Sequence, residues 1–233
     1  MISSIKKKIS EFRLKRGFRI LSRNLDLINE SLTAKQTIDF LFSKKGALIT
    51  PWQFKSEITS LFELYKSLNV NFALEIGTAN GGTLFGHCKL ANESATIISI
   101  DLPGGKFGGG YPDWKIPVYK RFKRKGQSLN LIRASSHEAA TINQVKELLN
   151  ANKLDYLLID GDHTYEGVKK DFELYSPFVK PGGAIVFHDI VPHPGSACKV
   201  DEFWNEVKKN HTHKEFIDDK KQTCFGVGVI LKN

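Results

Sequence analysis

The chain has few cysteines, and no two of them lie close together. Cys88, Cys198 and Cys224 are scattered over 233 residues, and none of them belongs to a C-x-x-C pair. An odd number of widely spaced cysteines argues against a disulfide framework and lacks the spacing of a structural zinc site. We therefore expect reduced thiols in a cytoplasmic protein.

Long apolar runs are missing as well. No uninterrupted apolar stretch approaches the roughly 18 residues that cross a bilayer, and the N-terminus lacks the apolar stretch of a signal peptide. We therefore expect a protein that is neither secreted nor transmembrane. Hydrophobic residues make up 41% of the chain and charged residues 25%, which predicts a folded protein with a buried core rather than a disordered chain.

Positive charge is concentrated at the N-terminus. The formal net charge is +9, and the first 25 residues hold eight Lys or Arg against one acid, Glu11. Because the remainder is nearly balanced, the basic character belongs to an arm, residues 1–49, and not to the domain that we expect at residues 50–233. A nucleic-acid partner is therefore not expected.

The arm also has apolar residues at helical spacing. They recur every three or four positions on either side of Gly17, as Ile2, Ile5, Ile9 and Phe12 and then as Phe18, Leu21, Leu25 and Ile28. This pattern predicts two short amphipathic helices that pack on the domain or on a second copy of the chain. A basic amphipathic segment on an anionic membrane surface is the open alternative.

Beyond Thr50, short apolar segments alternate with segments long enough for crossover connections. Five strands are expected at residues 72–76, 96–100, 129–132, 154–159 and 184–187. Strands separated in this way form a parallel sheet, and the amphipathic helices between them cover both of its faces. Two further strands, 215–217 and 225–231, are joined by a short polar turn and should pair antiparallel. The expected fold class is α/β, a doubly wound, mostly parallel, seven-stranded sheet with an antiparallel last strand, plus N-terminal helices.

A glycine-rich turn follows the first expected strand and leads into a helix. Residues 77–83 read GTANGGT, and such glycines let the backbone approach a ligand next to the free N–H groups of a helix N-terminus. Asp101 ends the second strand, where a carboxylate can accept both hydroxyls of a ribose. The G-x-x-x-G-G spacing differs from the G-x-G-x-x-G of dinucleotide binding, which argues against an NAD(P)-dependent oxidoreductase.

Carboxylates and imidazoles gather at the ends of the fourth and fifth expected strands. They are Asp160, Asp162, His163, His188 and Asp189. Their oxygen atoms suit Mg²⁺ or Mn²⁺, and an imidazole among them shifts the preference toward Mn²⁺, Fe²⁺ or Zn²⁺, so we expect a divalent-metal site there. Three other histidines, His193, His211 and His213, lie in connections or on polar faces and are expected to have structural roles.

Three motifs together resemble a known family. LEIGTANGGT, SID and LLIDGDHTYEGVKKDFELYSPFVKPGGAIVFHDI look like class I S-adenosylmethionine-dependent methyltransferases of the cephalosporin hydroxylase-like and macrocin-type O-methyltransferase group, over most of the chain from Pro51 to Lys232. The resemblance implies a Rossmann-like fold that binds S-adenosyl-L-methionine. The residues that it places around the methionine end of this cofactor are Glu75, Gly77, Thr78, Gly81, Gly82 and Thr83.

The same resemblance assigns further positions. It implies that Asp101 holds the ribose and that Ser135 and Ser136 lie near the adenine. Asp160 and Asp189 match the metal-ligand positions of metal-dependent relatives, whereas His188 stands where those relatives often carry another acid.

These observations predict a transferase that methylates a hydroxyl group on a small-molecule or saccharide acceptor with the help of a divalent metal. His163 is the expected base because the pKa of a free imidazole is about 6.5, and Asp162 is the alternative. A non-catalytic scaffold that retains the cofactor pocket and, with less support, an NAD(P)-dependent oxidoreductase are the competing interpretations. A homo-oligomer is also open.

Overall fold

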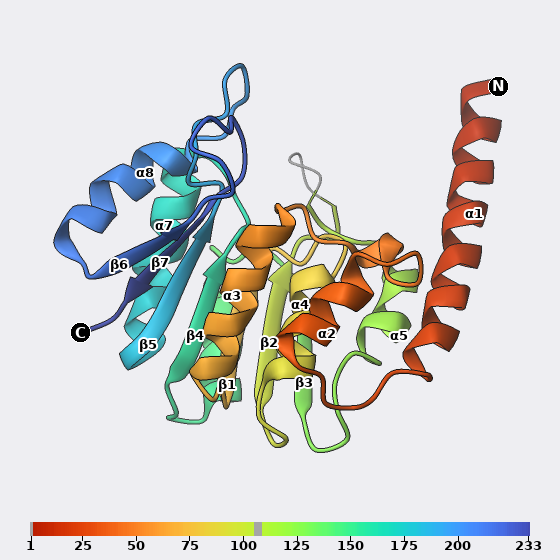
Figure 1. Cartoon of the computed structure of the whole chain (residues 1–233), viewed down its shortest axis with the longest axis horizontal. Coiled ribbons are helices and arrows are strands. Elements are labelled where there is room, and N and C mark those ends of the chain that lie inside the picture. The colour runs from red at the N-terminus through yellow and green to blue at the C-terminus, as the bar shows by residue number, and fades with distance from the viewer. Residues whose placement is uncertain (1, 105–108) are drawn as a thin grey trace.

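A seven-stranded sheet forms the centre of the protein, as seen in a computed structural model that describes residues 2–104 and 109–233 (Figure 1). Of residues 2–8 only the backbone is described. In chain order the strands are β1 (Phe72–Ile76), β2 (Thr96–Asp101), β3 (Ser128–Arg133), β4 (Leu154–Ile159), β5 (Val179–His188), β6 (His213–Phe216) and β7 (Val227–Leu231).

The strand order β3-β2-β1-β4-β5-β7-β6 confirms the predicted fold class. The first five strands pair in parallel, and β7 pairs antiparallel with both β5 and β6. The order reverses beside β1, where the chain moves from β3 back to β4 on the other side. In such a sheet the crevice beyond the carboxyl ends of the central strands is where ligands bind.

Five of the seven strands, β2, β3, β5, β6 and β7, differ in their bounds from the prediction, and the differences in β5 and β7 have a clear physical reason. β5 begins at Val179 rather than at Ala184, because Val179 already pairs with Leu154 before a bulge shifts the register. β7 begins at Val227 rather than at residue 225, because Phe225 and Gly226 have φ angles of +64° and +84°. Those angles lie outside the extended region, so the strand cannot include them.

Helices cover both faces of the sheet. They are α1 (Ile2–Leu25), α2 (Ala34–Leu41), α3 (Lys55–Ser67), α4 (Gly82–Leu90), α5 (Ile116–Tyr119), α6 (Ala139–Leu149), α7 (Tyr165–Tyr175) and α8 (Val200–Val207). Ala73 and Ile97 point to a core shared with α1 to α5, whereas Leu74 and Ile98 point to a core shared with α6, α7 and α8. This alternation is what a sheet buried on both faces requires.

The arm differs from the prediction of two short helices, because α1 continues through Gly17 as one helix of 24 residues. A Cβ atom on Gly17 would lie 2.8 Å from Cδ1 of Leu48, so this glycine permits a close approach to the domain and does not end the helix. Phe18, Leu21 and Leu25 are buried in the core beyond it. The second apolar stripe therefore packs on the domain, as expected.

The rest of the arm also joins the main core. Helix α2 begins with a capping box in which Thr33 and Gln36 satisfy each other's backbone N–H groups, and Ile38 and Leu41 are buried with α3 and α4. The boundary near residue 50 stays a prediction, although residues on both sides of it share one core. Among the described residues, no helix combines the length and the apolar character needed to cross a membrane.

We expect Gly86→Ala to destabilise the protein, although alanine favours helices. A Cβ atom at Gly86 would lie 2.0 Å from Cζ of Phe62, a fully buried ring of α3 that has no room to move. The expected loss is about 1–3 kcal/mol in the free energy of unfolding, measured by urea denaturation. Gly17→Ala is the matched control, because only a flexible leucine methyl must move there. A Gly86→Ala protein as stable as the wild type would contradict this packing.

Candidate active site

Two cavities open where the parallel strands end. The first, of about 260 Å³, contains Asp160, His188 and Asp189 in its wall, and we call it the acidic cavity. The second, of about 330 Å³, has Ser135 and Ser136 in its wall, and we call it the serine cavity. The two share wall residues, namely Gly77, Asp101, Gly109 and Gly161. The cavities are therefore neighbouring compartments of one cleft.

The glycine-rich turn forms the ridge between these compartments. Gly77 has a φ angle of +93°, and a Cβ atom there would lie 1.9 Å from the carbonyl oxygen of Asp160. Only glycine fits this approach of two backbone segments. The turn leads into α4, whose first residues, Gly82 and Thr83, line the acidic cavity, and the preceding Gly81 supplies no side-chain cap. The start of α4 therefore offers backbone N–H donors to a ligand.

Asp101 lines both cavities and organises the backbone around it. One carboxylate oxygen accepts from the N–H groups of Thr78 (3.0 Å) and Ala79 (2.8 Å). The other accepts from Leu102 (2.7 Å) and Gly110 (2.9 Å). Burial raises the pKa of Asp101, and the four backbone donors oppose that shift by stabilising the carboxylate. Asp101 thus joins the glycine-rich turn to the segment that follows β2.

The serine cavity is supported by a buried acid from α7. Ser136 Oγ donates a hydrogen bond to Asp171 Oδ1 (2.6 Å), and His137 Nε2 lies 3.1 Å from the same oxygen. Asp171 is fully buried. The hydrogen bond to Asp171 raises the pKa of His137, while partial burial opposes the shift.

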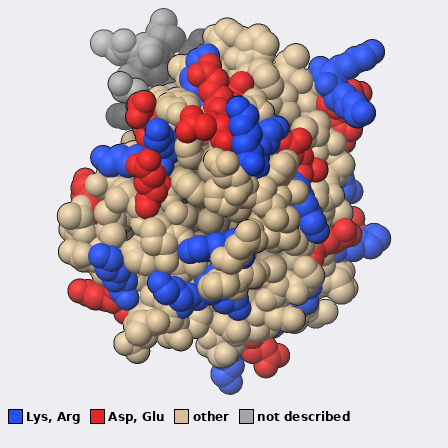
Figure 2. All heavy atoms as spheres, turned by 90° about the vertical axis from the view of Figure 1, so that its left-hand side faces the viewer, with Lys and Arg blue, Asp and Glu red and all other residues tan. Residues whose placement is uncertain are grey.

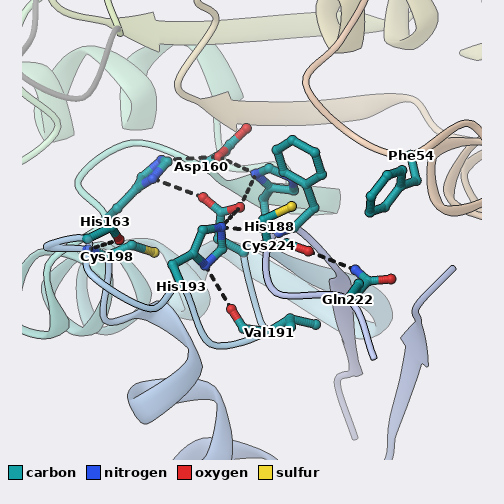
Figure 3. Close-up of polar contacts among 12 residues, drawn as sticks. Phe54, Asp160, His163, His188, Val191, His193, Cys198, Gln222 and Cys224 are labelled. Atoms are coloured by element: carbon teal, nitrogen blue, oxygen red, sulfur yellow. Dashed lines mark hydrogen bonds and ion pairs between the residues drawn. The ribbon is translucent and has the colours of Figure 1, made fainter. Parts of the chain in front are cut away.

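The acidic cavity holds two carboxylates surrounded by imidazoles (Figure 3). His163 lies between them, with Nε2 at 3.3 Å from Asp160 Oδ1 and Nδ1 at 3.0 Å from Asp189 Oδ2. His188 Nδ1 lies 3.0 Å from Asp160 Oδ1 and 3.4 Å from Asp189 Oδ1. His193 Nε2 lies 3.2 Å from Asp189 Oδ1. Residues from β4, β5 and the loop after β5 thus meet at one point.

The charges of this cluster stabilise one another. Burial opposes ionisation of Asp160 and Asp189, but His188 and His163 hold the pKa of each carboxyl below its usual value. Burial likewise opposes the charged form of His163, yet hydrogen bonds to Asp160, Asp189 and Cys198 raise its pKa well above the usual value. The pKa of His188 is also raised, because the two carboxylates outweigh its burial. These pKa shifts all favour the charged forms, so the partly buried cluster favours ion pairing between the imidazoles and the carboxylates.

The backbone is strained where it forms the acidic cavity. Ala79, Asp189 and Phe225 have φ angles of +43°, +63° and +64°, a region that side chains with a Cβ rarely adopt. All three residues line the cavity. Such strain persists only where the surroundings hold it, and it concentrates at functional sites.

All of the predicted site residues except Glu75 and Gly81 lie in the walls of the cleft. Asp162 lies in the serine cavity, apart from the metal-site candidates, and its exposed carboxylate accepts from the N–H group of Thr164 before α7. Glu75 is buried between His87, 3.1 Å away, and Ser99, and it lines neither cavity. Gly81 also lies behind the wall, where a Cβ atom would meet the Tyr119 ring.

The structure adds residues to the site that the sequence did not indicate. His193 joins the cluster because Asp189 turns the chain back within four residues. Phe225 stacks on His188 with ring centroids 5.8 Å apart. Residues 50–53, between η1 (Ala47–Ile49) and α3, close the acidic cavity from the N-terminal side. The i,i+4 spacing of Asp189 and His193 was the one available signal for the first of these.

Comparison with known proteins identifies the family of the chain. The profile of a family described as a methyltransferase domain matches residues 74–190, half of the chain. The chain belongs to this methyltransferase-domain family. The matched region begins in β1 and ends just after Asp189, so it contains both carboxylates of the cluster. An uncharacterized protein of Acanthamoeba polyphaga mimivirus is 39% identical over 117 residues, and the chain spans about half the length of that curated relative.

Solved structures show the same fold. An O-methyltransferase from Bacillus cereus in complex with SAH matches with a TM-score of 0.58 and 12% identity, covering 100% of both chains. The O-methyltransferase TomG from Streptomyces achromogenes, in complex with SAM, matches with a TM-score of 0.55 and 14% identity, covering 94% of this chain and 89% of that one. This methyltransferase-family chain therefore has the Rossmann-like fold that was predicted.

We expect His137 to titrate above the usual histidine pKa of about 6.5, because Asp171 stabilises its protonated form. Since the folded pKa exceeds the unfolded one, this interaction stabilises the fold fully at low pH and is lost as the pH rises through the folded pKa. NMR titration of the imidazole measures the value, and Asp171→Asn should lower it. Asp201→Asn, on α8, is the control. A wild-type value at or below the usual one would refute the interaction.

Proposed function

We propose that the protein transfers a methyl group from S-adenosyl-L-methionine to a hydroxyl oxygen of a small-molecule or saccharide acceptor. One observation carries this proposal. The segment that matches the methyltransferase family, residues 74–190, is the segment that builds the ridge, the serine cavity and both buried carboxylates. The binding of SAH and SAM by the two O-methyltransferases of the same fold supports the choice of cofactor.

The two compartments suit the two ends of the cofactor. In this proposal the adenosine occupies the serine cavity beside Ser135 and Ser136, with its ribose at Asp101. The methionine part crosses the ridge at Gly77 toward the start of α4, where Thr78, Gly82 and Thr83 line the acidic cavity. Its carboxylate would meet the uncapped N–H groups there. Glu75 and Gly81 then support the turn from behind rather than contact the cofactor.

A divalent cation fits the donor atoms of the acidic cavity. Oxygen or nitrogen atoms of Asp160, His188 and Asp189 lie within 4.8 Å of one another. His193 Nδ1 lies 2.8 Å from the carbonyl oxygen of Val191, and the single lone pair of its Nε2 accepts from the N–H group of Phe225 at 3.1 Å. Nε2 therefore carries no proton to donate to Asp189 Oδ1, 3.2 Å away, and this carboxylate oxygen is left available to a cation.

The cation would be held by Asp160, His188 and Asp189. When bound, it supplies positive charge that lowers the proton affinity of a neighbouring hydroxyl. An imidazole among carboxylates favours a transition metal over Mg²⁺, so Mn²⁺ is the better candidate of the two. Asp189 Oδ1 and His188 Nε2, both buried without a hydrogen bond to any described residue, are consistent with a ligand that completes the site.

The chemical step needs alignment and a proton acceptor. The acceptor oxygen attacks the methyl carbon, the carbon–sulfur bond breaks with its electron pair going to sulfur, and the hydroxyl proton must leave. His163 lines the acidic cavity and Asp162 does not, so we assign the proton to His163. Because Asp160 and Asp189 hold both ring nitrogens of His163, it must first give up its own proton and one of these contacts.

Isothermal titration calorimetry with S-adenosylhomocysteine tests the cofactor assignment. We expect the wild type to bind it and not to bind NADH. Asp101→Asn should weaken binding roughly ten- to a hundredfold, because a hydrogen bond to a charged group is lost. Asp189→Asn, in the other compartment, should change the affinity by less than about threefold. Binding of NADH, or of neither ligand, would overturn the assignment, and binding without product from any hydroxylated acceptor would favour a scaffold.

The cation site can be tested without turnover. We expect the wild type to remove the electron paramagnetic resonance signal of free Mn²⁺, with Mg²⁺ competing poorly. Asp189→Asn should weaken Mn²⁺ binding at least about tenfold. His188→Glu should reduce the preference for Mn²⁺ over Mg²⁺, because it replaces nitrogen by oxygen. Equal competition by Mg²⁺ in the wild type would refute the role given to His188.

A further inference from the structure

Helix α1 presents a face that nothing in the described chain covers. It stands at the edge of the molecule, and only its C-terminal half meets the domain (Figure 1). Phe18 packs edge-on against Trp114 with ring centroids 5.2 Å apart, and Arg121 Nη1 donates to Ser22 Oγ at 2.5 Å. These contacts fix the rotation of α1 about its axis, and therefore which face points outward.

The outward face carries large apolar side chains. Because α1 is continuous, helical spacing puts Ile9 and Phe12 on the side opposite to the stripe that is buried on the domain. Ile9 is 48% exposed and Phe12 is 67% exposed. Ile20, 50% exposed, lies on the same side by helical spacing, and Leu27, just past the end of the helix, is 77% exposed. Three exposed large side chains on one side of α1, with an exposed leucine just after it, mark an interaction surface.

Arginines lie between these apolar residues. Arg13, Arg16, Arg19 and Arg23 are all exposed. Among the described side chains, no ion pair involves any of the four, and the acid of this helix, Glu11, pairs with Lys15. We call these four arginines together with Ile9, Phe12, Ile20 and Leu27 the outer face. Its positive charge is not neutralised within the described chain.

The opposite side of the molecule is different. The view of the side that carries β6 and α8 shows Lys and Arg interspersed with Asp and Glu (Figure 2). Basic residues there lie near acids, as half-buried Lys208 does with Glu215 at 2.8 Å. The outer face of α1 is therefore a local feature and not a consequence of a basic surface overall.

We propose that the outer face docks on an anionic membrane surface. Apolar side chains would enter the boundary between headgroups and acyl chains, while the arginines contact anionic headgroups. A second copy of the chain fits less well, because a symmetric contact would bring eight arginines together. The phosphates of a nucleic acid would contact the arginines but would leave the apolar side chains of Phe12 and Leu27 exposed to solvent. This proposal does not depend on the proposed function of the cleft.

Vesicle sedimentation of the full chain tests the proposal. The probes are vesicles of phosphatidylcholine alone and of phosphatidylcholine with about a quarter phosphatidylserine. We expect the wild type to sediment with the anionic vesicles only. Replacing Arg13, Arg16, Arg19 and Arg23 by Gln should lower partitioning at least about a hundredfold, at roughly fivefold for each basic residue. Phe12→Ser combined with Ile20→Ser should lower it about tenfold through lost apolar burial.

The control variant removes the same charge elsewhere. Replacing Lys209, Lys214, Lys220 and Lys221, exposed residues near β6, by Gln should leave partitioning unchanged. All substituted side chains are exposed, so circular dichroism should show an unaltered fold. The proposal fails if the wild type does not sediment with anionic vesicles, or if the lysine control reduces vesicle partitioning as much as the arginine variant does. It also fails if light scattering shows a dimer of the wild type that the Phe12 variant abolishes. Binding to duplex DNA that survives the Phe12 variant, without vesicle binding, would also overturn it.

Discussion

Two carboxylates that face the same small cavity, buried Asp189 and partly buried Asp160, are the constraint around which the site is built. Asp160 and Asp189 cannot both remain charged in a buried cavity unless positive charge lies beside them. The chain supplies it as His163, between the two carboxylates, and His188, 3.0 Å from Asp160. Asp189 has a positive φ angle, and the loop after it brings His193 Nε2 to 3.2 Å from its carboxylate.

The positions of Gly77, Asp101, Asp160 and Asp189 could be predicted from the sequence because all of them end parallel strands. The carboxyl ends of the parallel strands lie at one edge of such a sheet, regardless of the structure of the segments that connect the strands. Asp162 could not be placed by this rule. It lies three residues beyond the end of β4, where side-chain direction depends on the start of the next helix, and it accepts from the backbone of Thr164 in the other compartment. The residues from the loops, such as His193, were missed for the same reason.

The arm shows a different limit of sequence reasoning. Each of its apolar stripes has a helical pattern, but a glycine between two such patterns can either end a helix or allow a close approach to another segment. Gly17 could have ended a helix, and instead it lets α1 approach Leu48. A single continuous helix fixes the angle between the stripes, so burying Phe18 and Leu21 necessarily turns Ile9 and Phe12 outward. The local sequence therefore does not show whether α1 has one apolar face or two, because this depends on the contact between Gly17 and Leu48 in the folded protein.

The charge balance of the acidic cavity bears on the reaction that we propose. The sulfonium of the methyl donor is positive and becomes a neutral thioether as the methyl group leaves, so free carboxylates beside it would stabilise the reactant more than the transition state. In the structure Asp160 and Asp189 are instead engaged by His163 and His188, and a cation would engage them as well. Carboxylates that are already paired keep positive charge near the acceptor oxygen and do not strongly stabilise the sulfonium of the methyl donor. The ion pairs of the cluster would thus favour methyl transfer as well as make the buried acids tolerable.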